Sequence, residues 1–365
     1  MTTEPSAHRS STWRPKLLVL LVSLLLCVGV VELGLRLLVR EDRFLDTATE
    51  EYWKAALRAA SGSPRQPRDT QYDTTLGWRM TPFWSRPGVQ HNSRGYRGVD
   101  EFTREPRGTR ILAVGDSFTY GLGVEDSATF SAVLARNTGT EVINAGVNAY
   151  GADQAFLMWD LKARYLNPAI VILGYFVDDF NRNGLSIRDR AKPHFVYDSI
   201  ERGFQLKGIP VPTLEELDAS GALDPEAQLR VARLVRFLRQ RVEAKTGRLA
   251  VERLKRNAQI NDYILRRMRD SAEHAGARLL VMVIGHCYDG DPENLWIERT
   301  IVEACRSNQI EYLNMAAQMR ENDFASFYLS NCHWSERGHD FAAEKLADAL
   351  GLDFREENST DPSIR

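Results

Sequence analysis

The sequence is poor in cysteine and has almost no net charge. Its four cysteines, at 27, 287, 305 and 332, form no CxxC pair and no cluster with histidine at the spacing of zinc ligands. A small disulfide-stapled fold and a structural zinc site are therefore excluded, and we expect no metal. The formal charge of −2 provides no overall basic field, so we expect no nucleic-acid partner.

Long apolar runs are absent except over residues 17–39, where Glu32 and Arg36 are the only charged residues. The length suits one transmembrane helix, and two charges four residues apart can pair on one helix face. Basic residues before the run favour a cytoplasmic N-terminus (1–16) and an extracytoplasmic position for the rest. A cleaved signal peptide is the competing interpretation, although it requires small residues where this chain continues Val-Val-Glu-Leu-Gly-Leu-Arg. A cytosolic protein is the remaining alternative.

Beyond the anchor, the pattern predicts a linker and an irregular N-terminal extension at 40–104, followed by a regular alternation of strands and helices. The expected strands are RILAVGDS, EVINAGV, AIVILGYFV, RLLVMVIG and IEYLNM, and the expected helices cover 127–137, 152–166, 257–275 and 335–350. Such alternation is typical of an α/β domain with a parallel sheet and crossover helices.

An insert at about 185–256 interrupts this alternation. It predicts a hairpin around HFVYDSIERGFQLKGIPVP and then a basic helix at about 225–245 that carries Arg230, Arg233, Arg236 and Arg239 on one face. This face is either solvated or rests on anionic lipid or an acidic glycan. The chain is expected to end in a flexible tail, 353–365. In an oxidising space Cys287, Cys305 and Cys332 allow one disulfide, and the sequence does not choose the pair.

Four polar blocks follow the expected strands. Strand ends carry Gly115-Asp116-Ser117, Asn144-Ala145-Gly146-Val147-Asn148 and Val177-Asp178-Asp179, and Asn331-Cys332-His333-Trp334 stands near the C-terminus. Ligands bind outside the carboxyl ends of strands in an open α/β sheet, so we expect these blocks to converge. A serine, a glycine turn and a histidine together are the groups that acyl transfer needs.

The nucleophile-elbow pattern GxSxG is absent, because Thr119 stands where the second glycine is required. The blocks ILAVGDSFTYGLGVED, NAGVNAYG, GYFVDDF and NCHWSERGH resemble instead those of the GDSL or SGNH hydrolase family, over about 105–352. The resemblance implies a three-layer, flavodoxin-like domain with a parallel sheet that cleaves or transfers ester-linked acyl groups, with no cofactor.

The same resemblance assigns roles to individual residues. Ser117 would be the nucleophile and His333 the base that takes its proton. The backbone N–H groups of Ser117 and Gly146 would bind the developing oxyanion, and glycine at 146 would let the backbone approach the substrate. Asn148 is a candidate substrate contact. Asp116 is expected to tie the turn by accepting backbone N–H groups.

Two positions depart from the family pattern. Asp178 stands where the family has an asparagine that donates to the oxyanion. Either Asp178 is protonated beside Asp179 and donates, or Asp179 holds a loop while Asp178 faces solvent. Asn331 stands where the family supplies an aspartate to orient the histidine, and we expect its side chain to accept from the imidazole N–H.

Other carboxylates could replace the missing aspartate: Glu336, Asp323 and Asp178 are the candidates. His339, on the closing helix, is expected to be structural.

These observations predict a membrane-anchored esterase or O-acyltransferase that acts outside the cytoplasm, in the periplasm or at the cell surface, on acyl groups of a cell-envelope glycan or lipid. The rival hypothesis, from a different class, is a weak or inactive binding module that keeps the pocket while Asp178 and Asn331 have eroded the catalytic machinery.

Overall fold

The computed structural model describes residues 13–38, 50–60, 69–223, 230–232, 234–235, 238, 248–288 and 290–355. Most of the expected basic helix at 225–245 lies outside the described residues, including Arg233, Arg236 and Arg239. The same is true of most of the N-terminal segment 1–16 and of residues 356–365 in the C-terminal tail.

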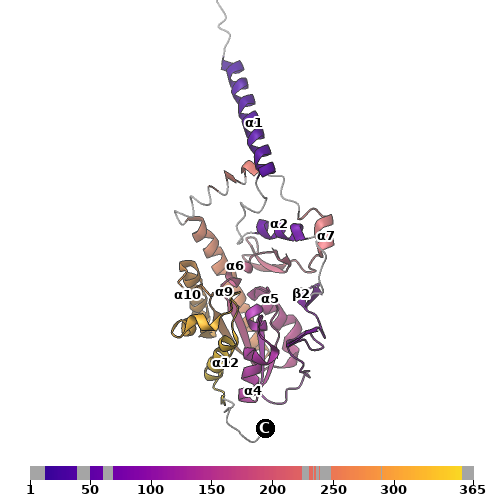
Figure 1. Cartoon of the computed structure of the whole chain (residues 1–365), viewed down its shortest axis with the longest axis vertical. Helices are drawn as coiled ribbons and strands as arrows, with labels where there is room; N and C mark the ends of the chain where they lie inside the picture. Colours follow the sequence, from indigo (N-terminus) through magenta and orange to yellow (C-terminus); the bar gives the residue numbers. More distant parts are fainter. Residues whose placement is uncertain are drawn as a thin grey trace, which may run out of the picture.

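A five-stranded parallel sheet forms the centre of the molecule (Figure 1). Its strands are β5 (Arg110–Gly115), β6 (Glu141–Asn144), β7 (Ile170–Phe176), β12 (Arg278–Ile284) and β13 (Glu311–Asn314), in the spatial order β13-β12-β7-β5-β6. Counted along the chain, this is the order 2-1-3-4-5 read from the β6 edge, which is the flavodoxin-like arrangement. The predicted fold class is confirmed.

The central strands explain why the sheet needs cover on both faces. Every residue of β5 and of β7 is buried, and both are nearly continuous apolar runs rather than alternating ones. Such a strand is stable only between two layers of helices. The β5–β7 register brings Gly115 opposite Gly174, so the carboxyl ends of both strands lie together at one edge.

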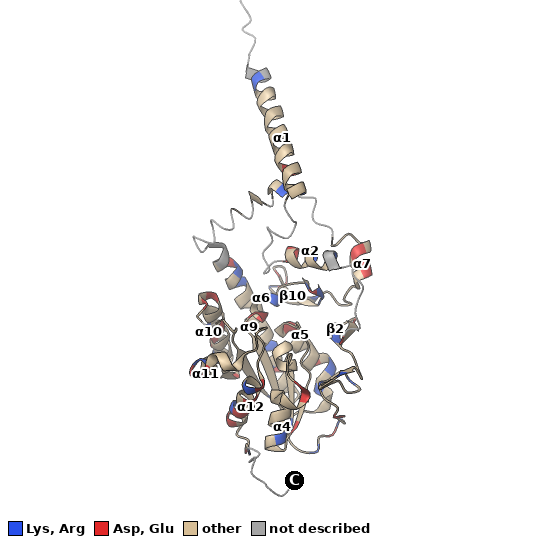
Figure 2. Ribbon diagram, viewed as in Figure 1, with Lys and Arg blue, Asp and Glu red and all other residues tan. Residues whose placement is uncertain are grey.

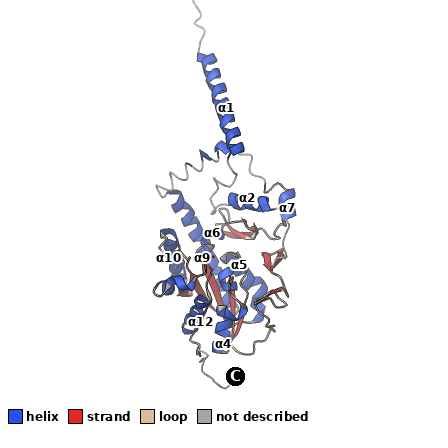
Figure 3. Cartoon of the chain, in the orientation of Figure 1, coloured by secondary structure: helices blue, strands red, loops and turns tan. Residues whose placement is uncertain are grey.

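Helices cover the two faces of the sheet (Figure 3). Right-handed crossovers put α4 (Phe130–Thr138) and α12 (Glu336–Leu350), which contact each other, on one face. On the other face lie α5 (Ala152–Leu157), α9 (Arg248–His274) and α10 (Pro292–Ser307), with α9 touching both of its neighbours. Shorter helices are α3 (Ser117–Tyr120), α6 (Asp179–Arg182), α7 (Leu214–Ala219) and α11 (Met315–Arg320).

Two-stranded antiparallel pairs surround this core. They are β1 (Thr70–Asp73) with β2 (Gly77–Met80), β3 (Ser85–Arg86) with β4 (Val89–Gln90), β8 (Ile187–Arg188) with β9 (Arg190–Ala191), and β10 (His194–Asp198) with β11 (Gly203–Lys207). The last pair is the hairpin expected in the insert.

The segment upstream of β5 packs behind α3. The buried guanidinium of Arg97 forms an ion pair with Asp126 and donates to the carbonyls of Tyr120 (3.2 Å), Gly121 (3.2 Å) and Val124 (2.7 Å). The backbone N–H of Arg97 donates to the carbonyl of Asn144 at 2.9 Å, within an isolated β-bridge. The irregular extension therefore holds the short helix at the end of the first sheet strand.

A largely apolar helix, α1 (Trp13–Leu38), extends away from the domain (Figure 1), and its charged residues lie toward its two ends (Figure 2). Within it, Lys16–Leu38 is long and apolar enough to cross a membrane, a property that an anchor shares with a signal sequence. Glu32 and Arg36 pair at 2.6 Å, as expected from their spacing. Arg230 of the insert donates to the carbonyl of Leu35 at 2.9 Å, so the insert reaches the end of α1. The helix α2 (Glu50–Ala60) follows.

Candidate active site

The candidate nucleophile, Ser117, is the first residue of α3, and only Asp116 separates it from the buried end of β5. Asp116 caps this helix, because its Oδ1 atom accepts a hydrogen bond from the backbone N–H of Phe118 at 2.9 Å. The expected turn-tying role of Asp116 is therefore observed. The N–H of Ser117 belongs to the first turn of α3, whose N–H groups have no partners within the helix.

The imidazole of His333 meets this serine. Its Nε2 atom lies 2.9 Å from Ser117 Oγ, although the two residues are 216 positions apart. Its Nδ1 atom lies 3.2 Å from the backbone carbonyl oxygen of Asn331. A carbonyl oxygen only accepts hydrogen bonds, so Nδ1 carries the proton and Nε2 is free to accept one from the hydroxyl. The ring of Phe118 stacks on the imidazole, with 5.2 Å between centroids.

Asn331 contacts the histidine differently from what the sequence predicted. Its exposed side chain accepts, through Oδ1, the backbone N–H of His333 at 3.2 Å, while its backbone carbonyl faces the ring. The backbone thus occupies the position expected for the amide. The carboxylates proposed as substitutes lie elsewhere: Asp323 pairs with Arg337 at 3.5 Å, and Glu336 is an exposed residue in the first turn of α12.

The protonation of His333 suits a base. Burial lowers the pKa of its imidazole, whereas the charge of Asp116 acts in the opposite direction and raises it. Because burial is the larger cause, the net pKa lies below the ordinary value for histidine. The ring is therefore neutral near pH 7, which is the state that can accept the serine proton.

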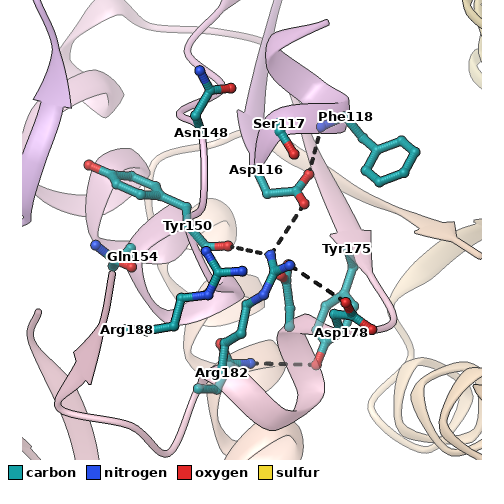
Figure 4. A network of polar contacts seen from close by, with 12 residues as sticks. Asp116, Ser117, Phe118, Asn148, Tyr150, Gln154, Tyr175, Asp178, Arg182 and Arg188 are labelled. Carbon is teal, nitrogen blue, oxygen red and sulfur yellow. Dashed lines mark hydrogen bonds and ion pairs between the residues drawn. The ribbon is translucent and has the colours of Figure 1, made fainter. Parts of the chain in front are cut away.

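Beneath Ser117, one arginine is surrounded by three carboxyl groups (Figure 4). Arg182 Nη1 donates to Asp179 Oδ1 at 2.9 Å and to the carbonyl of Tyr150 at 3.1 Å, and it lies 3.4 Å from Asp116 Oδ2. Its Nη2 atom lies 3.7 Å from Asp178 Oδ2. Two of these carboxyl groups, those of Asp116 and Asp179, are buried, and burial raises the pKa of both.

The two neighbouring aspartates differ in exposure. The side chain of Asp178 is 44% exposed and that of Asp179 is 1% exposed. Burial, with the nearby charge of Asp116, raises the pKa of Asp179 well above its usual range. Its Oδ2 atom has no hydrogen-bond partner among the described residues, so no donor stabilises a negative charge on it. Of the two arrangements predicted from sequence, this is the one in which Asp179 holds the loop and Asp178 faces solvent.

Close packing against α3 requires a glycine at position 146. A Cβ atom there would lie 2.3 Å from the backbone nitrogen of Tyr120. The N–H of Gly146 donates to Asn144 Oδ1 at 3.1 Å. The expected oxyanion donor is therefore engaged within the protein.

Asn148 is tied to the upstream segment. Its Nδ2 atom donates to Asp69 Oδ2 at 3.2 Å, and its carbonyl accepts from Trp78 Nε1 at 3.0 Å. Figure 4 shows its amide pointing away from Asp116 and Arg182. His339 is buried, its Nδ1 atom accepts from the N–H of Phe130 at 3.2 Å, and burial lowers its pKa to about 3. It is structural, as expected.

Two features of the site were missed in the sequence. Arg182 follows Asp179 by three residues and Asp178 by four, a helical spacing that favours ion pairs and that could have been noticed. The second feature is a disulfide between Cys287 and Cys332, next to His333. No local pattern pairs these cysteines, because they are 45 residues apart and meet only through the sheet.

No protein-family model matches the sequence, and no curated protein matches it. Among solved structures, the chain is similar to a lipolytic protein of the G-D-S-L family from Desulfitobacterium hafniense (17% identity, 67% of this chain and 100% of that one, TM-score 0.37). It is also similar to a lipase/acylhydrolase from Enterococcus faecalis (12%, 68% and 100%, TM-score 0.42). A third is an acetylxylan esterase from Geobacillus stearothermophilus (12%, 70% and 100%, TM-score 0.40).

Proposed function

We propose that this chain is a serine-dependent esterase or O-acyltransferase that cleaves ester-linked acyl groups through an acyl-enzyme. The observation that carries the proposal is the 2.9 Å contact between Ser117 Oγ and His333 Nε2, with the opposite ring nitrogen directed at a carbonyl. A hydroxyl within hydrogen-bond reach of an oriented neutral base is the arrangement that activates a serine. Resemblance of four sequence blocks to the GDSL family supports the same chemistry.

In the first step, Ser117 Oγ attacks the ester carbonyl carbon while its proton moves to His333 Nε2. The tetrahedral intermediate then collapses, and the imidazolium returns the proton to the departing alcohol oxygen. The acyl group is now esterified to Ser117. Water attacks this ester in a hydrolase and an acceptor hydroxyl does so in a transferase, with His333 again removing the proton. The two reactions differ only in the acceptor.

Charge on the tetrahedral oxygen needs hydrogen-bond donors. The N–H of Ser117 is the donor that we assign, since it begins α3 and its helix offers it no acceptor. The N–H of Gly146 can act as a second donor only after its hydrogen bond to Asn144 Oδ1 breaks. The half-exposed carboxylate of Asp178 opposes the developing negative charge. Losing one such donor typically costs about 2.7–4 kcal/mol of barrier, so we expect a slow enzyme.

We further propose that α1 anchors the catalytic domain to a membrane and that the domain lies outside the cytoplasm. The apolar span Lys16–Leu38 supports the anchor. An enzyme held at a membrane surface acts on what lies there, so its ester-bearing substrates would be glycans or lipids of the cell envelope.

A binding module with little or no activity is the second candidate. It is favoured by the engaged N–H of Gly146 and by the acid at position 178, because both reduce stabilisation of an oxyanion. Such a module would bind an ester-bearing ligand but would not complete an acyl transfer.

Labelling with a fluorophosphonate probe separates the two candidates, because the probe reacts only with an activated serine. The wild-type protein in detergent should incorporate the probe at Ser117, found by mass spectrometry, and hydrolyse p-nitrophenyl acetate. Ser117→Ala should lose both signals and His333→Ala should lose most of them. Ser307→Ala, at an exposed serine on α10, is the matched control and should behave as wild type. A wild-type protein that never labels would support the binding module instead.

A further inference from the structure

A disulfide joins the two loops that flank the candidate base. Cys287 lies three residues beyond the end of β12, and Cys332 immediately precedes His333. Their Cα atoms are 5.2 Å apart. The histidine loop is therefore fastened covalently to the carboxyl edge of the sheet, one residue away from the imidazole.

The two ends of the histidine loop are held by an isolated β-bridge between Tyr328 and Trp334 and by the N–H of Ser335, which donates to the carbonyl of Phe327 at 2.8 Å. The part that the disulfide fastens is the turn between these ends. It is a tight turn in which the N–H of Cys332 donates to the carbonyl of Leu329 at 3.0 Å and the N–H of Leu329 donates to the carbonyl of His333 at 2.7 Å. Cys332 has a left-handed backbone, with φ of 64°, which is unfavourable for a residue with a side chain. Its neighbours Ser330 and Asn331 are exposed.

The orientation of the imidazole depends on this turn. The acceptor for its Nδ1 proton is the carbonyl of Asn331, and that carbonyl belongs to the peptide bond that leads into Cys332. Rotation of the backbone at Cys332 would move the acceptor and the ring together. A buried carboxylate, by contrast, would hold the ring independently of the turn, and no described carboxylate side chain makes a hydrogen bond to His333.

At the other end, Cys287 is anchored by aromatic packing. The rings of its neighbours His286 and Tyr288 stack at 4.8 Å, and His286 stacks on Phe176 at 5.9 Å. Phe176 in turn packs on Phe118 at 4.7 Å, and Phe118 carries the imidazole of His333. The disulfide and these ring contacts together connect the end of strand β7, the loop after β12 and the histidine turn.

We propose that the Cys287–Cys332 disulfide positions His333, so that the protein reacts at Ser117 only in its oxidised state. This inference rests on the proposed function. A dithiol such as dithiothreitol supplies two electrons and two protons: the S–S bond breaks, two thiols form, and the dithiol closes to a cyclic disulfide. Freed from the β12 loop, the turn relaxes at Cys332 and the imidazole leaves Ser117. The activity is thereby restricted to compartments in which disulfides persist.

The experiment compares oxidised and reduced full-length protein in detergent. Fluorophosphonate labelling of Ser117 and kcat/KM for p-nitrophenyl acetate are measured before and after dithiothreitol, and again after reoxidation by glutathione disulfide. We expect both rates to fall about 100-fold on reduction and to return on reoxidation, because displacement of a catalytic group by about 1 Å costs that much. A chelator is present throughout, since the ligand atoms of His286, Cys287 and Cys332 lie within 4.8 Å of one another and the thiols could bind zinc.

Three variants isolate the disulfide. Cys287→Ser, Cys332→Ser and the double variant should all show the rate of reduced wild type and should not respond to dithiothreitol. Cys27→Ser removes an exposed free thiol of α1 and serves as the matched control, with full activity and full sensitivity to reduction. ¹⁵N NMR of the histidine side chains should show that the fixed Nδ1–H tautomer of His333 is lost on reduction while His339 is unchanged. A purely structural disulfide would not give this selective signature.

Each outcome bears on one claim. If reduced wild type and the double variant label at the oxidised wild-type rate, the positioning role is wrong while the proposed function stands. A fall in rate accompanied by loss of the His339 signals would mean general unfolding and would also overturn positioning. If the oxidised wild type fails to label, the proposed function is wrong and the inference goes with it.

Discussion

The nucleophile and the base of the candidate site are held by different parts of the molecule. Ser117 follows a fully buried strand, and the helix that it begins packs against Gly146 and the guanidinium of Arg97. His333 lies at the end of a turn, between the exposed residues 330–331 and the buried Trp334, and its ring is positioned by one stacked ring, one carbonyl and a neighbouring disulfide. The serine is thus surrounded by the core, whereas the histidine lies where the core meets an exposed turn.

Because of this difference, substitutions near Ser117 and substitutions near His333 should impair different properties of the protein. Changes behind Ser117 disturb the packing that stabilises the whole domain, so they should lower the free energy of unfolding. Changes around His333 leave the core intact and should alter rates instead. The predictions below test this division, beginning with the largest expected effect.

Arg97→Met should lower the free energy of unfolding by about 3–5 kcal/mol, the usual result of breaking a buried charge pair. The variant leaves Asp126 without its partner and three carbonyls of the α3 turn without a donor. Urea denaturation followed by circular dichroism measures the change. Arg136→Met, at an exposed arginine of α4, should stay within about 0.5 kcal/mol of wild type. Equal effects at both positions would contradict the role of the extension.

Gly146→Ala should destabilise the fold by about 1–3 kcal/mol, because the added methyl group would overlap the backbone of Tyr120 and Thr119. Since this backbone leads back to Ser117, labelling should also slow. Gly108→Ala is a suitable control, as no atom lies within 4 Å of a Cβ built there. Thermal unfolding of the two variants in parallel decides the matter, and a Gly146→Ala protein as stable as the control would refute the packing argument.

Asp178→Asn should raise kcat/KM by up to about tenfold, equivalent to about 1.4 kcal/mol of barrier. The substitution replaces a charge that opposes the oxyanion by a neutral amide, and the gain is modest because solvent already screens this side chain. Asp189→Asn provides a matched control: Asp189 is 43% exposed and also pairs with an arginine, Arg188. A drop in activity in Asp178→Asn alone would mean that the carboxylate itself is needed.

The acid limb of the pH profile reports on the base. His333 must be neutral to act, and burial lowers its pKa, so kcat/KM should persist as the pH falls through about 6.5 and decline only below it. Asp116→Asn removes a charge that raises this pKa, so it should move the limb to still lower pH. The pH dependence of kcat/KM for both proteins gives the answer. A limb above pH 6.5 would show that burial is not the dominant cause.

Asn331→Ala should have the smallest effect, with kcat/KM within about threefold and stability within about 0.5 kcal/mol of wild type. The atom that faces the imidazole is the backbone carbonyl, which the substitution retains. If the side chain were the group that orients the ring, its loss would cost orders of magnitude, as loss of the orienting carboxylate does in serine proteases. Steady-state kinetics distinguish the two cases.

Much of the fold could be read from the chain because its signals are local. Apolar runs such as 110–115 and 170–176 must be buried on both faces, and their spacing with helices leaves few topologies other than a parallel sheet. Since parallel strands end at a common edge, Ser117 and the blocks at 144–148 and 178–179 were expected to gather there.

Other assignments could not be read in this way because they depend on partners distant in sequence. The role of Asn331 was assigned to its side chain, since residue identity says nothing of where a backbone carbonyl points. Gly146 was assigned to substrate approach, and its close packing against the backbone of Tyr120 could not be foreseen. Asp178 and Asp179 are adjacent in the chain, but the fold leaves Asp178 half-exposed and buries Asp179. Burial then raises the pKa of Asp179.

The amino-acid sequence alone determined the apolar helix and the α/β alternation, because composition and periodicity act over a few residues, and the resemblance of its four blocks to a known family singled out the serine and the histidine as candidates. The tertiary structure alone decided which cysteines pair, which atom of Asn331 faces the imidazole and which carboxyl group Arg182 compensates. These are contacts between segments that the sheet brings together, and their energies depend on distance and burial, neither of which is written in local sequence.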